Sequence, residues 1–209
     1  MRRGMRLHGT PLSHFTRKIR VLLAELGVDF EFVRAPSVLA KEGAAYGDNP
    51  LRRVPTLIDG QVTVIDSDHI ARYLVAAHDP GDRLGVRSER VEDLNRLAVA
   101  NGVMDNEVVL ILAQRTGVDV GGAYFQKLRG GIEGGLAWLD ARVTEDARFD
   151  WGDVAVVCMW QHLEHYRLVS LDPYGRLAAR VARFAGRPSV LGTTPEVSLV
   201  EATTAGWKP

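Results

Sequence analysis

The chain has 209 residues, 46% of them hydrophobic, and its 26 basic residues balance its 26 acidic residues to a formal net charge of zero. That length is enough for one large domain or two small ones. The balanced charge argues against a nucleic-acid partner held by bulk charge. The single cysteine excludes an intrachain disulfide and fits a reducing compartment. No apolar run approaches the roughly 20 residues that cross a bilayer, so we expect a soluble, cytoplasmic protein without a membrane partner.

The first third of the chain alternates between strand and helix patterns. Apolar residues recur at helical spacing between His14 and Leu26, where Gly27 supplies a stop. Asp59-Gly60, between two short apolar runs, is a favoured hairpin turn. The expected elements are a strand over 5–9, a helix over 14–26, a strand over 29–33, an irregular or weakly helical segment over 34–50, strands over 56–58 and 62–65, and a helix from about 70 to 78.

Every strong pattern in the rest of the chain is helical. A linker over 79–86 is rich in proline, glycine and charge, and the candidate helices that follow cover 91–116, 123–143, 150–168 and 173–185. This change from mixed patterns to helical patterns alone predicts a chain of two domains, one α/β and one all-α. We expect a mixed domain of order β-α-β-(α)-β-β-α over 1–79 and an all-α helical bundle over 87–209.

Val54-Pro55 stands at the start of the strand predicted over 56–58. Proline cannot donate to a sheet ladder, so it is suited to a strand start. By itself this bond is expected to be trans, since only about 5–6% of X-Pro bonds in folded proteins are cis. A cis bond would turn the backbone N–H and C=O of Val54 outward, where an extended peptide ligand could pair with them as an added strand.

Asp66-Ser67 stands at the head of the helix that ends near residue 78. Either side chain could simply cap that helix, which contributes roughly 1 kcal/mol. The same free N–H groups and helix dipole also attract a carboxylate. The Ser67 hydroxyl adds a donor, and Asp66 can pair with an ammonium group. Beside a strand-pairing edge, this pair is suited to bind a small peptide with a free amino-acid end.

Five motifs in this order resemble those of the soluble, dimeric glutathione transferases, and the resemblance covers nearly the whole chain. They are the turn TPLSHFTRKIR over 10–20, NPLRRVPTL over 49–57, Asp66-Ser67, Asp150-Trp151-Gly152-Asp153, and Phe184 followed by Arg187-Pro188-Ser189. The resemblance implies a thioredoxin-like N-terminal domain, an all-α C-terminal domain and a cis Val54–Pro55 bond. It also implies glutathione as co-substrate, a homodimer, and no metal.

Glutathione conjugation needs a thiolate, because a thiol with a pKa near ~8.5 is mostly protonated at neutral pH. A hydroxyl at a helix N-terminus can stabilise that anion by a hydrogen bond and through the helix dipole. Ser13 matches the catalytic serine of serine-type members and is our candidate donor to the sulfur. The alternatives are Thr10 as donor, or Ser13 as a helix cap only.

The rest of the implied glutathione site comes from residues that match family positions. Val54 and Pro55 would pair with the peptide backbone, and Asp66 and Ser67 would hold the γ-glutamyl end. Asp66 stands where Glu or Gln is commoner in the family. Cations for the glycyl carboxylate would be Lys41 and Arg53. The alternative for both is a solvated surface charge, and it is nearly as strong an interpretation for Lys41. The basic residues of the first helix, Arg17, Lys18 and Arg20, are expected to face solvent or a subunit contact.

The second substrate is expected to be an apolar electrophile. The pocket for it would be lined by Leu12, His14, Phe15, Met104, Asp105 and Val108, although apolar residues at helical spacing are commonly ordinary core. His14 replaces the proline that usually follows the serine, and we expect it to form a neutral wall of the pocket. Trp207 is expected either to cover the pocket or to lie on the surface.

Two polar clusters in the helical half have structural interpretations. Asp150 and Asp153 are spaced as a capping box at a helix start. Cys158, His162 and His165 share one helix face, but residues spaced i, i+4, i+7 rarely suit one metal ion. We expect all three to be core or interface residues.

The favoured function is therefore conjugation of glutathione to small apolar electrophiles. A catalytically silent binding or assembly protein with this fold is one alternative. Another glutathione-dependent activity, such as peroxidase, isomerase or ether cleavage, is a second. The retention of Ser13, Val54-Pro55 and Asp66-Ser67 together favours the enzyme.

Overall fold

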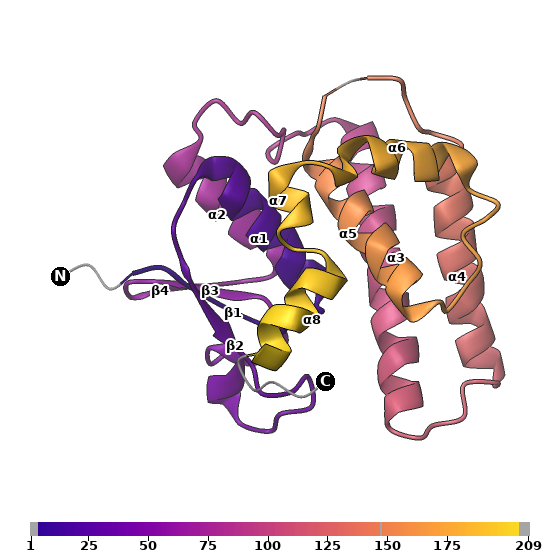
Figure 1. The fold of residues 1–209 in the computed structure, drawn as a ribbon, viewed down its shortest axis with the longest axis horizontal. Helices are drawn as coiled ribbons and strands as arrows, with labels where there is room; N and C mark the ends of the chain where they lie inside the picture. Colours follow the sequence, from indigo (N-terminus) through magenta and orange to yellow (C-terminus); the bar gives the residue numbers. More distant parts are fainter. Residues whose placement is uncertain (1–3, 147, 205–209) are drawn as a thin grey trace. The chain divides into compact units, whose positions relative to one another are not determined.

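The computed structural model describes residues 4–146 and 148–204. Its contacts divide the chain into two compact units. The first unit combines the chain up to Arg87 with the segment from Arg187 onward, and the second is Ser88–Gly186. Figure 1 shows strands only in the first unit, within the part of the chain that is described.

The first unit is built on a four-stranded sheet of order β2-β1-β3-β4. The strands are β1 (Arg6–Gly9), β2 (Glu31–Arg34), β3 (Thr56–Asp59) and β4 (Val62–Ile65). β1 runs parallel to β2 and antiparallel to β3, and β3 and β4 form an antiparallel hairpin. The predicted hairpin about Asp59-Gly60 is confirmed, with Gly60 at a positive φ of 61°.

Two helices pack against this sheet and against each other, α1 (His14–Leu26) and α2 (Ser67–His78). Ser13 caps the start of α1, and Gly27 ends it in the left-handed conformation that favours glycine. The side chains of Leu7, Leu22, Leu57 and other apolar residues fill the space between helices and sheet. The segment predicted to be irregular contains one short 3-10 helix, η1 (Gly43–Tyr46).

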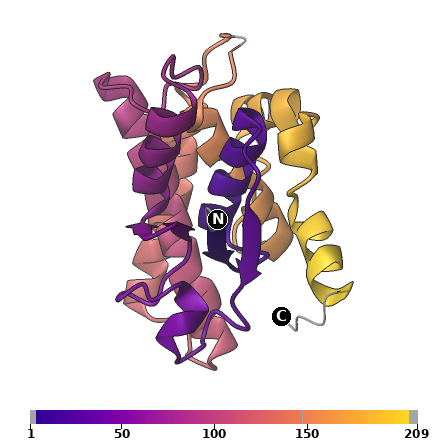
Figure 2. The ribbon, with the colours of Figure 1, turned by 90° about the vertical axis from the view of Figure 1, so that its left-hand side faces the viewer.

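The helices α7 (Pro188–Leu191) and α8 (Pro195–Thr204) belong to the first unit and lie beside α1 in both views (Figures 1 and 2). Arg187 binds the Glu25 carboxylate through two nitrogens, at 3.0 and 2.8 Å. Arg17 donates to the Val190 carbonyl at 3.2 Å. These contacts join the end of the chain to α1.

The expectation that the basic residues of α1 face solvent is wrong. Arg17, Lys18 and Arg20 are 4%, 0% and 9% exposed. Arg20 donates to Ser198 at 2.9 Å and to Glu201 at 3.1 Å on α8. The reason is that the C-terminal helices supply carbonyl, hydroxyl and carboxylate acceptors that cover this face of α1, so the guanidinium groups are buried with partners.

The second unit contains α3 (Val91–Arg115), α4 (Ala123–Asp140), α5 (Trp151–Tyr166) and α6 (Gly175–Ala185). α5 is its centre, because almost every side chain in its first three turns is buried. Among the described residues, α3 is the one helix long and apolar enough to cross a membrane. Core helices of soluble proteins meet the same test, and α3 packs against α4 and α5.

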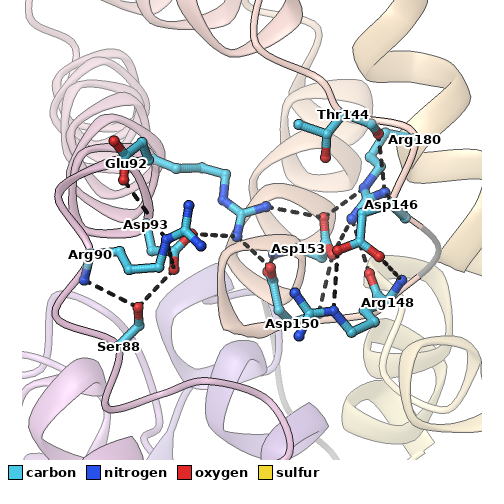
Figure 3. A network of polar contacts seen from close by, with 11 residues as sticks. Ser88, Arg90, Glu92, Asp93, Thr144, Asp146, Arg148, Asp150, Asp153 and Arg180 are labelled. Atoms are coloured by element: carbon cyan, nitrogen blue, oxygen red, sulfur yellow. Dashed lines mark hydrogen bonds and ion pairs between the residues drawn. The ribbon is translucent and has the colours of Figure 1, made fainter.

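A polar network ties the start of α5 to the rest of the second unit (Figure 3). Asp150 and Asp153 form the predicted capping box, which is confirmed. The buried Asp153 carboxylate accepts two hydrogen bonds from Arg180 of α6, at 2.9 and 2.8 Å. Arg96 of α3 donates to Asp150 at 2.5 Å. The same Arg180 also donates to backbone carbonyls between residues 144 and 148.

Replacing Asp153 with Asn should therefore destabilise the second unit. Removing one partner of a buried ion pair leaves the other charge uncompensated, which typically costs about 3–5 kcal/mol. Chemical denaturation monitored by circular dichroism measures the loss. Asp146→Asn is the matched control, because Asp146 is exposed and its partner Arg148 is exposed too. Equal stability of the two variants would contradict the role given to Asp153.

The Glu25 contacts predict an acid-sensitive attachment of the chain end. Burial opposes ionisation of Glu25, but hydrogen bonds from Arg187 and Ser189 outweigh it and hold the pKa of Glu25 below its ordinary value of 4.5. A depressed carboxyl pKa contributes stability that is complete above the unfolded value and is lost as pH falls through the folded one.

Wild-type melting temperature should therefore fall more steeply below pH 4.5 than that of Glu25→Gln. Thermal melts across this pH range make the comparison. Glu89→Gln, at an exposed glutamate, should keep the wild-type profile. Parallel profiles for wild type and Glu25→Gln would show that this ion pair has no such effect.

Candidate functional site

Strand register brings three of the predicted site segments to one end of the sheet. His8 of β1 pairs with Thr56 of β3, so the turn that follows β1 lies beside the residues that precede β3. Thr56 also pairs with Ile65 of β4, so Asp66, which follows β4, lies at the same end. The turn over 10–13, Val54-Pro55 and Asp66-Ser67 therefore converge.

Ser13 occupies the N-cap of α1. Its Oγ accepts a hydrogen bond from the Thr16 N–H at 3.2 Å. A hydroxyl that accepts in this way keeps its own proton for donation. The first turn of α1 contains no acidic residue, so no side-chain charge there opposes the positive end of the helix dipole. Ser13 is half-buried and suited to donate to an anion.

A second hydroxyl, that of Thr10, lies in the same turn. The Ser13 N–H donates to the Thr10 carbonyl at 3.2 Å, which closes the turn. Thr10 is buried, and its Oγ1 has no hydrogen-bond partner among the described residues. Both hydroxyls that the sequence offered as donors therefore lie in the turn between β1 and α1.

The Val54–Pro55 peptide bond is cis. Asn49 organises the turn before it: its Nδ2 donates to the Arg53 carbonyl at 3.0 Å, and its Oδ1 accepts from the Leu51 N–H at 3.0 Å. The Asn49 side chain is buried. Sequence reasoning used Asn49 only as part of the motif over 49–57 and missed this role. It is possible because the side-chain amide carries both a donor and an acceptor.

The segment that carries Lys41 is held by a buried tyrosine. The Tyr46 hydroxyl lies 2.9 Å from the carbonyls of both Val38 and Ala40. Burial raises the pKa of Tyr46, so its hydroxyl remains a donor at neutral pH. Lys41 and Arg53 are exposed and make no ion pair with any residue in the described ranges. Their positive charges are thus available to an anion.

His8 lies beneath this segment and was missed by the sequence analysis. It is 6% exposed, and neither ring nitrogen has a hydrogen-bond partner among residues 4–146 and 148–204. Its ring lies so close to Gly47 that an added Cβ there would be 3.0 Å from the ring carbons. Burial and the charge of Arg6 lower the pKa of His8, which keeps the ring neutral in the core.

Asp66 heads α2 in an unusual backbone conformation, with φ of 74°. Its Oδ1 accepts from the N–H groups of Asp68 and His69, at 2.9 and 3.2 Å. The predicted cap is therefore made by Asp66. Ser67 is buried, and its Oγ accepts from the Lys18 ammonium at 3.2 Å. Positive φ at a non-glycine residue is strained and is concentrated at functional sites.

Comparisons with known proteins agree with this arrangement. A family model described as "Glutathione S-transferase, N-terminal domain" matches residues 7–82. A glutathione transferase family member from Pseudomonas fluorescens Pf-5, solved with bound glutathione, has a TM-score of 0.80 at 28% identity, covering 91% of this chain and 98% of that one. A glutathione S-transferase from Methylobacillus flagellatus KT with glutathione bound has a TM-score of 0.77 at 28% identity, covering 91% and 99%.

Residues 7–82 thus match the N-terminal domain of glutathione S-transferases, and the chain as a whole is similar in fold to solved glutathione transferases. Its relative YibF from Escherichia coli K12, an uncharacterized glutathione-transferase-like protein, is 35% identical over 120 residues, 53% of this chain and 55% of YibF. The match to a glutathione S-transferase of Silene vulgaris is 34% identical and covers 36% of each chain. The matched regions thus span about half or less of these relatives. The predicted thioredoxin-like domain with an all-α domain is confirmed as the fold.

Among the residues predicted for the second-substrate pocket, the first unit holds Leu12, His14 and Phe15. His14 is buried, its Nδ1 accepts from the Phe15 N–H at 3.1 Å, and the two rings meet edge to face. The second unit holds the other three on α3: Met104 is buried, Val108 is half-buried and Asp105 is exposed. The pocket itself stays a prediction, and Trp207 lies outside the described residues.

The histidines of α5 have partners that spacing did not reveal. His162 is buried with Glu107 of α3, and the His162 Nδ1 lies 2.8 Å from a Glu107 carboxylate oxygen. His165 contacts the ring of Tyr166 edge to face. Cys158 is buried in the same helix. The expectation that His162 and Cys158 are core residues is confirmed by their burial.

Because Asp66 caps α2, two substitutions at this position should differ in how much stability they cost. Asp66→Ala removes the acceptor for two N–H groups while keeping a strained φ, and should cost about 1–2 kcal/mol. Asp66→Asn keeps an acceptor oxygen, and Asn is among the side chains that tolerate positive φ, so its cost should be about 0.5 kcal/mol or less. Urea denaturation of both variants tests this, and equal losses would contradict capping by Asp66.

Proposed function

We propose that this protein binds glutathione at the end of the sheet where the three segments converge and conjugates the glutathione thiolate to small apolar electrophiles, forming a thioether with displacement of the electrophile's leaving group. The convergence of Ser13, Val54-Pro55 and Asp66-Ser67 through strand register is the observation that carries the proposal. The glutathione bound in the solved relatives from Pseudomonas fluorescens and Methylobacillus flagellatus supports it further.

Each charged or pairing group of glutathione has a chemical counterpart in the first unit. The backbone of Val54 would pair with the cysteinyl peptide unit as an added strand. The N-terminus of α2 and the Ser67 hydroxyl would bind the γ-glutamyl carboxylate, and the second carboxylate oxygen of Asp66 would bind the ammonium. Lys41 and Arg53, exposed and without ion pairs among the described residues, would attract the glycyl carboxylate.

We assign the thiolate-stabilising role to Ser13. Its Oγ already accepts from the Thr16 N–H, which orients the hydroxyl proton away from the helix, and the helix dipole favours an anion beside it. Stabilising the thiolate lowers the pKa of bound glutathione and raises the fraction of nucleophile at neutral pH. Thr10 is the second candidate donor in this turn.

The electrophile, the assembly and the location of the protein are part of the same proposal. We propose that Leu12, His14 and Phe15 of the first unit contact the electrophile. We propose a homodimer, as the family resemblance implies. We infer a cytoplasmic enzyme of detoxification that needs no metal, nucleic acid or membrane.

Calorimetric titration with glutathione and with S-hexylglutathione tests the proposed function. Binding of both would support a peptide site with an adjoining apolar pocket. Binding of glutathione alone would favour another glutathione-dependent activity with a narrow second pocket. Binding of neither would overturn the proposal in favour of a silent binding or assembly protein.

The serine assignment predicts that Ser13→Ala lowers kcat for a chlorinated nitroaromatic electrophile by about 100-fold, the order seen when one positioned donor to a developing anion is removed. The affinity for glutathione should change little, because the peptide contacts remain. The pKa of the bound thiol, measured by ultraviolet titration of the thiolate, should rise.

Thr10→Val is the comparison variant, since it removes the other hydroxyl with little change in shape. If kcat falls strongly in Thr10→Val and stays normal in Ser13→Ala, then Thr10 is the donor to the thiolate. Melting curves of both variants separate loss of the α1 cap from loss of the donor.

A further inference from the structure

Lys18 is the largest fully buried side chain in the described chain that carries a charge. It extends from the second turn of α1 to the first turn of α2. Its Nζ donates to Asp68 Oδ1 at 2.9 Å and to Ser67 Oγ at 3.2 Å. The ammonium therefore lies directly beneath the helix start that we assign to the γ-glutamyl carboxylate.

Burying an ammonium group is costly, and an ion pair only partly offsets the lost hydration. Asp68 keeps 24% of its side chain exposed, so solvent screens one side of the pair. Two helices can be packed with an apolar side chain at lower cost. Asp68 balances the charge of this ammonium, and the same ammonium also binds Ser67 at the start of α2, so its charge acts on that hydroxyl as well as on the ion pair.

Lys18 also determines what the Ser67 hydroxyl can do. An ammonium group has no acceptor, so in this contact Ser67 Oγ must accept. The hydroxyl proton of Ser67 is then directed elsewhere and can donate to a carboxylate at the head of α2. Accepting from a cation also polarises the hydroxyl and strengthens that donation.

We propose that Lys18 is a positioning residue that orients Ser67 and supplies positive charge for the α-carboxylate of the γ-glutamyl group, so that the site selects peptides with that carboxylate. This inference rests on the proposed function. Asp68 fixes the ammonium in place and, by its negative charge, partly offsets the attraction.

The experiment compares two ligands and two charge variants by calorimetry. The ligands are glutathione and 4-aminobutyryl-cysteinyl-glycine, which is glutathione without that α-carboxylate. Lys18→Met should weaken glutathione binding about ten-fold or more, the scale of a hydrogen bond to a charged group, while binding of the analogue stays unchanged. Lys127→Met, at an exposed lysine of α4, is the matched control and should change neither affinity.

If Lys18 has a structural role alone, Lys18→Met should weaken the binding of both ligands equally, and that result would overturn the inference. Unchanged glutathione affinity in Lys18→Met would overturn it too. If Lys18→Met does not fold, Asp68→Asn decides, because it removes the opposing charge. Asp68→Asn should increase the preference for glutathione over the analogue, and an unchanged or reduced preference would overturn the inference. A wild-type protein that binds neither ligand would instead overturn the proposed function, and the role of Lys18 with it.

Discussion

Antiparallel pairing of β3 with both β1 and β4 brings three chain segments that are far apart in the sequence to one end of the sheet. A shift of one residue in either register would turn every side chain of a strand to the opposite face, so these positions are strongly specified. The buried core beneath the strands, including Leu7 and Leu57, enforces that register. Packing of the core therefore fixes the strand register, and the strand register places the polar residues of the candidate site.

Three helices of this structure begin at a side chain that accepts hydrogen bonds from their free N–H groups. Ser13 caps α1, Asp66 caps α2 and Asp150 caps α5, each through a side-chain oxygen. At α5 the cap is part of a network that includes Arg180 and serves stability. At α1 and α2 the caps lie at the end of the sheet where we propose that glutathione binds. The same physical interaction thus supports folding in one unit and, as we propose, ligand binding in the other.

Buried cations are the feature that sequence reasoning misjudged. Arg17, Lys18 and Arg20 follow one another closely on α1, and charged residues on a helix ordinarily face solvent. The C-terminal helices cover the two arginines, and α2 covers the lysine. The expectation failed because helical periodicity describes one helix, whereas burial depends on every element that packs against it.

The sequence by itself determined the order of strands and helices up to residue 185, the hairpin at Asp59-Gly60, the helix starts and the family resemblance, because these depend on neighbours within a few residues. It did not predict α7 and α8. Only the tertiary structure decided that Ser67 contacts Lys18, that His162 contacts Glu107, and that His8 lies unpartnered beneath Gly47 among the described residues. It also decided that the segment from Arg187 onward groups with the first unit. These pairings join residues distant in the chain, and local propensity carries no information about which distant surfaces meet.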